Sequence, residues 1–465
     1  MTTALAAFPR AAAAHAVLRR SAPSADARLD TIPTLLRFEF SERVETRFTR
    51  LLLTNARGDT IALGAVTFGD DGHAVILAAI RSTLGPGRYS VRWQTAGADG
   101  HPSRGQFAFT VNTSAVLPPP VPSTAVTLPN TSFADSSTGK GGGPDAVAAT
   151  NAEVALFDQR SFFYVVIRWA QYVAAFLVVG ALVFGRFVLQ PLTGRLADPH
   201  TLLAGTRTRT QRIGAAASIS LVIVQIGRML AQRVTLQGGG DFKMEVSFGE
   251  LLIGTAWGTG LLLTLAGAVV AAVGFLSAEK SKAFQTPLLV IAVSAVSVGF
   301  GLSGHQAGSD FSPSLAVGLD AIHNLSAASW LGTVALLALV ALPLARRDPS
   351  TDHSTVAAIL RVFSPVMLVS AGLAGVTGLV LATLNLGSIS ALWQTEYGRV
   401  LLIKLAILSL VAATGAFNWK RVLPTAGTPS STRLLQRTAG AEALVALAAL
   451  AVVAVLVATP MPSMR

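Results

Sequence analysis

The sequence predicts an N-terminal all-β sandwich or barrel followed by an all-α bundle of about eight transmembrane helices. Only 13% of the 465 residues are charged and 51% are hydrophobic, whereas soluble domains carry about 25% charged residues. Long uncharged apolar runs are confined to the chain after Phe162, and the region before it shows apolar and polar residues in alternation. Two different environments, water and lipid, are therefore expected in one chain.

Composition also limits the chemistry. The chain contains no cysteine, which excludes disulfides, zinc ribbons, Cys-x-x-Cys copper motifs and thiol catalysis. Any metal site must use His, Asp, Glu, Met or backbone groups. The net charge of +12 could indicate nucleic-acid binding, but the basic residues cluster between apolar runs, as topology signals do. We expect no nucleic-acid partner.

Residues 1–14 are small and apolar and end in an alanine run immediately before His15. This pattern resembles the remnant of a secretory signal peptide with an A-x-A cleavage site, although it is short and lacks a basic segment. Cleavage after this run would make His15 the first residue of the mature chain. The alternative is a disordered N-terminus that is retained.

Residues 15–112 are predicted to form the β domain. Apolar and polar residues alternate in 36–40, 89–93 and 107–111, which places one set of side chains on a buried face. Turn signals rich in Gly, Asp, Asn and Pro separate such runs at 55–59, 69–72 and 85–87, a spacing typical of a sandwich or small barrel. Residues 113–158 contain three consecutive prolines and three consecutive glycines and are expected to be a flexible linker.

Residues 159–465 are predicted to form the transmembrane domain. The expected spans are 163–187, 213–232, 251–276, 285–303, 316–343, 362–385, 400–418 and 438–458. Each is long enough for a helix to cross about 30 Å of hydrocarbon at about 1.5 Å per residue, and helices satisfy their own backbone hydrogen bonds in lipid.

The distribution of basic residues predicts the orientation. Thirteen lie after spans one, three, five and seven, and four lie on the opposite side. The thirteen are Arg195, Arg207, Arg209, Arg212, Lys280, Lys282, Arg346, Arg347, Arg361, Lys420, Arg421, Arg433 and Arg437, and the four are Arg233, Lys243, Arg399 and Arg465. Since basic loops stay cytoplasmic, we expect a plasma-membrane protein whose β domain and C-terminus are extracytoplasmic.

The β domain contains one candidate metal site. Asp99 and His101 are two residues apart, so in an extended segment both side chains point to the same face. If His15 is the mature N-terminus, its α-amine and ring nitrogen can chelate one metal ion. Three nitrogens and a carboxylate oxygen suit Cu(II). The alternative is that Asp99 caps a turn and His101 is an ordinary loop residue.

The β region resembles CopC, a periplasmic copper-binding β-barrel family. The resemblance is carried in order by 15–18 (HAVL), 21–23 (SAP), 36–38 (LRF), 87–93 (GRYSVRW), 99–102 (DGHP) and 105–107 (GQF). It implies Cu(II) ligation by His15, Asp99 and His101. Some CopC proteins have a second, Met-rich Cu(I) site, but residues 40–60 contain no Met, so the resemblance does not extend to that site.

Ionisable groups within membrane spans are costly and therefore are functional candidates. His305 lies at the predicted outer end of the fourth span, Asp310 in the following loop, and Asp320 and His323 in the fifth span. Asp320 and His323 are three residues apart, so they share one helix face. The four could form an outward-facing metal funnel, or His323 could hydrogen-bond a neighbouring helix with Asp320 as its partner.

The membrane region resembles the CopD family over roughly residues 163–462. The resemblance is carried by 320–332 (DAIHNLSAASWLG), 377–378 (TG), 397–404 (YGRVLLIK), 418–421 (NWKR) and 458–462 (ATPMP). It implies copper transport, often described as uptake. Among other polar residues, Arg168 is expected to snorkel to the outer surface, and Arg228, Lys404 and Glu442 to form structural ion pairs.

The leading prediction is a copper carrier rather than an enzyme. The outer domain captures Cu(II) and the helix bundle passes copper across the lipid bilayer, with import as the expected direction and Cu(I) as a possible form within the membrane. The alternatives are a copper-resistance buffer or sensor without transport, a copper oxidase with an N-terminal His ligand, and a haem-binding membrane cytochrome. The sequence leaves the oligomeric state open.

Overall fold

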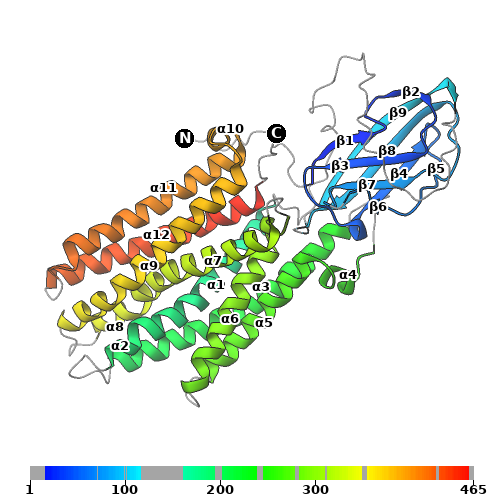
Figure 1. The fold of residues 1–465 in the computed structure, drawn as a ribbon. Helices are drawn as coiled ribbons and strands as arrows, with labels where there is room; N and C mark the ends of the chain where they lie inside the picture. The colour runs from blue at the N-terminus through cyan, green and yellow to red at the C-terminus, as the bar shows by residue number, and fades with distance from the viewer. Residues whose placement is uncertain are drawn as a thin grey trace, which may run out of the picture. The chain divides into compact units, whose positions relative to one another are not determined.

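The computed structural model describes residues 16–70, 72–98, 100, 102–116, 161–193, 202–237, 245–277, 282–308, 312–347, 353–425 and 429–459. Two compact units are present, one of β-strands and one of helices (Figure 1). This confirms the predicted fold class. Residues 1–14 and most of the predicted linker lie outside the described residues, although strand β9 continues past the predicted domain end to Val116.

The β unit consists of two sheets. The strands are β1 (Leu18–Ala22), β2 (Arg28–Thr31), β3 (Leu35–Phe40), β4 (Arg50–Asn55), β5 (Thr60–Ile61), β6 (Thr67–Phe68), β7 (Val75–Ala79), β8 (Gly87–Ala96) and β9 (Pro102–Val116). One sheet has the order β1-β3-β7-β6 and the other β2-β9-β8-β4-β5. All pairs are antiparallel except β2 with β9, which is parallel.

The predicted alternation explains how the two sheets form a core. In β3, Leu36, Phe38 and Phe40 are buried, while Arg37 and Glu39 on the other face form a salt bridge of 3.0 Å. The buried side chains of β3 join those of β8 and β9 in one hydrophobic cluster. The predicted strands at 36–40, 89–93 and 107–111 are therefore confirmed.

The predicted turn at residues 55–59 closes β4 and β5. Asn55 Oδ1 accepts hydrogen bonds from the backbone N–H groups of Arg57 (2.9 Å) and Asp59 (3.0 Å). Gly58 has φ +88°, a left-handed conformation that residues with a Cβ rarely adopt. The residue types that predicted the turn are thus the ones that build it.

The helical unit contains eight helical segments that are long and apolar enough to cross a membrane. They are Phe162–Leu192, Leu202–Gln237, Ala256–Leu276, Phe284–Leu302, Pro313–Arg346, Thr355–Leu386, Glu396–Val422 and Leu434–Ala458. The corresponding long helices are α1 (Phe162–Val183), α3 (Leu202–Gln237), α5 (Ala256–Leu276), α6 (Lys282–Leu302), α7 (Pro313–Leu336), α9 (His353–Leu386), α11 (Glu396–Phe417) and α12 (Pro429–Ala458). Each predicted span overlaps one of these segments.

Two boundaries differ from the prediction. Helix α3 begins at Leu202, eleven residues before the predicted 213, because basic and hydroxyl residues extend it beyond its apolar part. The third span does not begin at 251: a short helix α4 (Phe248–Leu252) ends there, Gly254 has φ +83°, and Thr255 caps α5 by accepting from the N–H of Gly258 at 2.9 Å.

Helices α1 and α7 lie in the middle of the helical unit, with α9, α11 and α12 on one side and α3, α5 and α6 on the other (Figure 1). Glycines allow the central pair to touch along the backbone: a Cβ on Gly180 would lie 2.5 Å from the carbonyl carbon of Gly332, and a Cβ on Gly332 would overlap the carbonyl oxygen of Phe176. Close approach through small residues is a common way in which membrane helices pack.

Three spans contain π-helical segments, namely η3 (Phe184–Leu189) after α1, η6 (Leu337–Ala341) after α7 and η7 (Asn418–Val422) after α11. Short α2 (Gln190–Leu192) and α8 (Leu342–Arg347) continue the first two. All three segments lie at the predicted inner end of the bundle, which is the end where α1 finishes. π-Helical turns are rare and often occur at functional sites.

Candidate metal sites

The three ligands predicted in the β domain, His15, Asp99 and His101, lie outside the described residues. The structure does describe the strands that flank them. Ala16 follows His15 and is fully buried. Strands β8 and β9 pair up to Ala96 and Pro102, so Asp99 and His101 belong to the connection between them.

The described flanks of the predicted ligands meet on one short segment, residues 41–45. The backbone N–H of Ala16 donates to Glu42 Oε1 at 2.7 Å. Val44 pairs with Gly97 as an isolated β-bridge, and the N–H of Glu45 donates to the carbonyl of Ala96 at 2.8 Å. The same segment therefore binds the residue after His15 at one end and the β8 terminus at the other.

His73 is the other histidine of the β domain, and its contacts are structural. Its ring stacks on Phe68 with centroids 4.0 Å apart, and Nδ1 lies 3.4 Å from Arg43 Nη2. Since a guanidinium only donates, Nδ1 accepts. The sequence prediction assigned no function to His73, and this packing supplies a different role.

In the membrane unit, the four predicted residues are placed unequally. His305 begins a short helix, η5 (His305–Gly308), just beyond α6, and Asp310 lies outside the described residues. Asp320 and His323 are both in α7. His323 is ten residues from the helix start, or about 15 Å at 1.5 Å per residue, deeper than the one or two turns that the sequence suggested.

The ring of His323 is held from α9 by its Nδ1 atom. Nδ1 lies 3.0 Å from the carbonyl oxygen of Ala374 and 3.2 Å from Thr377 Oγ1. The Thr377 hydroxyl donates to the carbonyl of Leu373 at 2.7 Å, and a carbonyl can only accept. Nδ1 must therefore carry the proton in this arrangement. In the neutral ring Nε2 then has its lone pair available, which is the form in which histidine binds metals.

Gly378 makes room for this ring. A Cβ added at Gly378 would lie 2.8 Å from His323 Cε1, closer than real side chains approach. The pair Thr377-Gly378 thus orients the imidazole with a hydroxyl and accommodates it with a missing side chain. Both contacts come from α9, so the site belongs to two helices.

Asp320 lies one turn above His323 in a polar surrounding. Its Oδ2 accepts from Asn324 Nδ2 at 2.9 Å, and its charge acts on Lys404 and Tyr397 of α11. Lys404 also acts electrostatically on His323. The predicted alternative, in which Asp320 is the hydrogen-bond partner of His323, is wrong for the partners described here: Nδ1 bonds to α9 instead.

A chain of amides links η5 to this cluster, and sequence reasoning did not identify it. Gln306 Nε2 donates to Asn385 Oδ1 at 3.2 Å, and Asn385 Nδ2 donates to the Tyr397 hydroxyl at 3.2 Å. Gln306 adjoins His305, so the chain anchors the beginning of η5 to α9 and α11. A polar Asn near the end of an apolar span was the available signal for Asn385.

Two expectations about other polar residues need correction. Arg168 does not snorkel: it is 3% exposed, Nη1 donates to Gln171 Oε1 at 3.2 Å, and the guanidinium lies over the Tyr172 ring at 5.6 Å. Glu442, expected to form an ion pair, accepts from Asn418 Nδ2 at 2.7 Å. Amides and aromatic rings, which sequence patterns cannot pair, supply these partners.

Arg228 was also expected to form an ion pair. It donates to the hydroxyl and the carbonyl oxygen of Ser303, both at 3.1 Å, and lies over the Trp257 ring at 5.3 Å. These contacts join α3, α5 and α6 near the predicted outer end. They show a structural role, as expected, with partners of another kind.

The described residues contain no group of three or more His, Asp and Glu side chains close enough to hold a metal ion. The α7 cluster offers one imidazole nitrogen and one carboxylate, a partial donor set. That fits a cation that passes through and is bound briefly, because a resident metal ion in a closed site takes four or more protein ligands. The cluster can therefore contribute to a pathway but does not by itself form a storage site.

Comparison with known protein families covers most of the chain in three successive parts. The CopC domain matches residues 18–112, the N-terminal domain of copper resistance protein D-like proteins matches residues 158–312, and copper resistance protein D matches residues 357–456. The three matches follow the order of the β unit and the helical unit.

Individual relatives agree with these matches. "Copper transport protein CutJ" from Bacillus subtilis (strain 168) is 24% identical over 464 residues, covering 98% of this chain and 76% of the relative. "Protein YobA" from Escherichia coli (strain K12) is 30% identical over 98 residues, covering 21% of this chain and 79% of the relative. The crystal structure of PcoC, a methionine-rich copper resistance protein from Escherichia coli, is 30% identical over 21% of this chain and 100% of that chain, with a TM-score of 0.20.

Proposed function

Because the chain belongs to the family in which a CopC domain is fused to a CopD membrane domain, we propose that it binds Cu(II) in its β domain and carries copper across the membrane through its helix bundle. The proposed copper-binding domain is residues 15–112, joined by the linker 113–158 to the transmembrane domain 159–465. Residues 1–14 are proposed to be removed as a signal peptide.

The β unit supports the Cu(II) part of this proposal. Segment 41–45 binds Ala16 at one end and the end of β8 at the other, which favours a short distance between His15 and the pair Asp99 and His101. The N-terminal amine, two imidazoles and a carboxylate form a donor set that suits Cu(II). The β domain contains no Met between residues 15 and 112, so we do not propose a second, Met-based site.

The observation that carries the transport proposal is the geometry of His323. The Nδ1 atom is fixed by the Ala374 carbonyl and Thr377, and the Nε2 lone pair remains available to a metal cation. An outer-shell carbonyl of this kind orients histidine ligands and raises their basicity. Asp320, one turn nearer the predicted outer end, adds a carboxylate at the approach to this ring.

We propose import, with the β domain and the C-terminus outside the cell. The basic residues that favour this orientation are also the ones that would remain on the inner side. The sequence contains no nucleotide-binding motif, so the copper gradient, the membrane potential or another ion would drive movement. Whether copper crosses as Cu(II) or Cu(I) is an outcome of the experiment below.

The experiment is copper flux into proteoliposomes that contain an internal copper indicator, run with and without an external reductant. His323→Gln and Asp320→Asn are expected to reduce flux by about tenfold or more while leaving Cu(II) loading of the β domain unchanged. His15→Ala and His101→Ala are expected to abolish Cu(II) loading. Glu442→Gln, a membrane carboxyl bound to Asn418, and His73→Ala are the matched controls.

Three outcomes would contradict the proposal. Copper loading that survives both β-domain variants excludes the proposed Cu(II) site. Normal loading with no flux in the wild type identifies a buffer or sensor rather than a carrier. Reductant-dependent oxygen consumption by the copper-loaded chain identifies an oxidase.

A further inference from the structure

The buried face of α3 is polar along its whole length. Thr206, Thr210, Ser218, Gln225 and Arg228 are each at most 2% exposed. Their spacing of three, four, seven or eight residues places them on one side of the helix. The distance from Thr206 to Gln225 is roughly 28 Å at 1.5 Å per residue, close to the thickness of the hydrocarbon layer.

The opposite face of α3 is apolar and exposed. Ile219, Ile223 and Ile226 are 46%, 64% and 44% exposed. A helix with this arrangement has its apolar side toward lipid and its polar side toward the bundle interior. Such a pattern is the reverse of a helix in a soluble protein, and polar residues that face the interior of a membrane bundle mark substrate and ion pathways.

Several of these interior polar groups have no partner among the residues that the structure describes. They are the hydroxyl groups of Thr206 and Thr210 and both amide atoms of Gln225. Ser218, by contrast, donates to the carbonyl of Gly214 at 2.7 Å. A buried hydroxyl or amide without a partner destabilises a fold, so Thr206, Thr210 and Gln225 are not explained by packing.

The polar face is interrupted at one level. Leu221 is fully buried, and the Phe275 ring of α5 covers Gly214, where an added Cβ would lie 2.7 Å from the ring. This apolar level separates Gln225 on the outer side from Thr210 and Thr206 on the inner side. A single apolar constriction between two polar regions is a common arrangement in membrane conduits.

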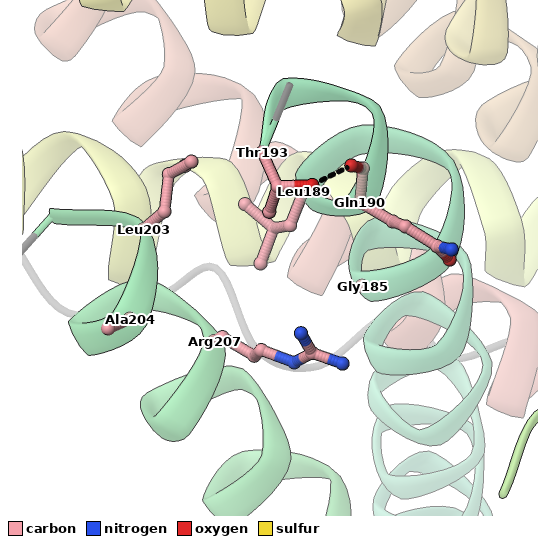
Figure 2. Close-up of a pocket in the computed structure, with 7 residues that line it drawn as sticks. All are labelled: Gly185, Leu189, Gln190, Thr193, Leu203, Ala204 and Arg207. Carbon is pink, nitrogen blue, oxygen red and sulfur yellow. Dashed lines mark hydrogen bonds between the residues drawn. The ribbon is translucent and has the colours of Figure 1, made fainter. Parts of the chain in front are cut away.

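A pocket of about 250 Å³ lies at the inner end of α3. Figure 2 shows it between the π-helical end of the first span, represented by Gly185 and Gln190, and the beginning of α3, with Leu203 and Arg207. Leu203, Thr206 and Thr210 are spaced by three and four residues, so the inner part of the polar face points toward the same side as one pocket wall. Arg207 is the charged residue of that lining, which favours release of a cation over binding.

We propose that the inner half of the copper pathway runs along the polar face of α3, from the Leu221–Phe275 constriction past Thr210 and Thr206 to the pocket beside Arg207. This inference rests on the proposed function and extends it beyond the α7 cluster, which lies toward the other end. The lining offers hydroxyl and amide oxygens and no sulfur, so the permeant is a cation that keeps oxygen ligands, including water, in this half.

The test replaces the two threonines by valine, which has the same shape without the hydroxyl. Thr206→Val/Thr210→Val is expected to reduce copper flux into proteoliposomes roughly fivefold or more, with unchanged Cu(II) loading and an unchanged or higher Tm, because the change removes two unpartnered buried hydroxyls. Thr206→Ser/Thr210→Ser keeps the hydroxyls and is expected to retain flux. Thr383→Val, an exposed threonine of α9 whose hydroxyl donates to Val380 at 2.7 Å, is the matched control.

The outcomes separate this inference from the proposed function. Wild-type flux together with normal flux in the valine double variant overturns the α3 pathway and leaves the transport proposal standing. Equal loss in the serine and valine variants also overturns it, because packing and not the hydroxyl would then matter. Absence of wild-type flux overturns transport itself, and the pathway with it.

Discussion

The imidazole of His323 and the missing side chain of Gly378 form a contact that a single methyl group can test. Gly378→Ala places a Cβ 2.8 Å from His323 Cε1, so the ring must turn away from Ala374 and Thr377. We expect copper flux to fall by about tenfold. Helix stability should not fall, because alanine is the stronger helix former. Flux and Tm measured on the same preparation check both parts.

Gly375→Ala is the control for this prediction. Gly375 lies on the same helix, one turn before Gly378, and an added Cβ there meets no atom within 4 Å. Both changes alter helix propensity equally, and only one reaches the ring. Equal flux in the two variants would show that the ring position is irrelevant.

Glu45 makes the stability of the β domain depend on pH. Burial raises the pKa of its carboxyl group above the ordinary 4.5, although Arg47 and Arg43 lower it. A raised folded-state pKa means that ionisation opposes folding, so the destabilisation is complete above the folded pKa and disappears as the pH falls through that value to below 4.5. Glu45→Gln is expected to raise the Tm of the β-domain transition at pH 7 and to leave it unchanged near pH 4.

Calorimetry of the detergent-solubilised chain at the two pH values measures this difference. Glu39→Gln is the comparison, because Glu39 is paired with Arg37 at the surface and exposed pairs contribute about 0–1 kcal/mol. A lower Tm for Glu45→Gln at pH 7 would mean that the two arginines outweigh burial.

Between elements, the contact of α1 with α7 is the tightest packing of the helical unit. Gly332→Ala drives a methyl group into the Phe176 carbonyl, so the helices must separate. Overpacking of this kind costs about 1–3 kcal/mol. We expect a lower midpoint in unfolding by a denaturing detergent, followed by the loss of far-UV circular dichroism.

Gly318→Ala serves as the comparison on the same helix. It is exposed, and an added Cβ has no neighbour within 4 Å. The same glycine-to-alanine change there is expected to be neutral or stabilising. If both variants unfold at the wild-type midpoint, the backbone contact contributes nothing to the stability of the bundle.

The elements themselves were predictable because each has a strong pattern. Alternation in 36–40 reappears as the buried and half-buried pattern of β3, and each predicted apolar run overlaps a spanning helix. Helix ends were less predictable: the polar start of α3 continues the helix without any apolar signal. The π-helical segments have no sequence signature that we used.

The site was predictable only in part. Asp320 and His323 follow from their cost in lipid, but Thr377 and Asn385 are uncharged and come from another helix, so no spacing rule connects them to His323. The partners of Arg168 and Arg228 are an amide, a serine and aromatic rings, whereas charge patterns suggest only other charges. His15, Asp99 and His101 remain predictions.

At the scale of the whole molecule, the absence of cysteine makes the orientation directly measurable. Single cysteines at exposed Ser388, after α9, and exposed Thr425, after η7, lie on opposite ends of the bundle. The basic loops predict that Ser388 is outside and Thr425 inside. An impermeant maleimide added to intact cells is therefore expected to label Ser388→Cys and not Thr425→Cys.

Permeabilised cells provide the control, since both cysteines should then react. Labelling of Thr425→Cys alone in intact cells would invert the molecule and place the proposed pocket beside Arg207 outside. Such a result would turn import into export without changing any residue contact described above.

The glycine contact between α1 and α7 also has a mechanical meaning. Two helices whose main chains touch cannot slide past each other, so they would travel as one stiff block. The imidazole of His323 rides on that block, yet its anchor, the Ala374 carbonyl, belongs to α9. Any rocking of α9 against the block would stretch that bond before it disturbed the block, and the ring would then be released to swing. The histidine is thereby wired to report, or to follow, the displacement of its neighbour.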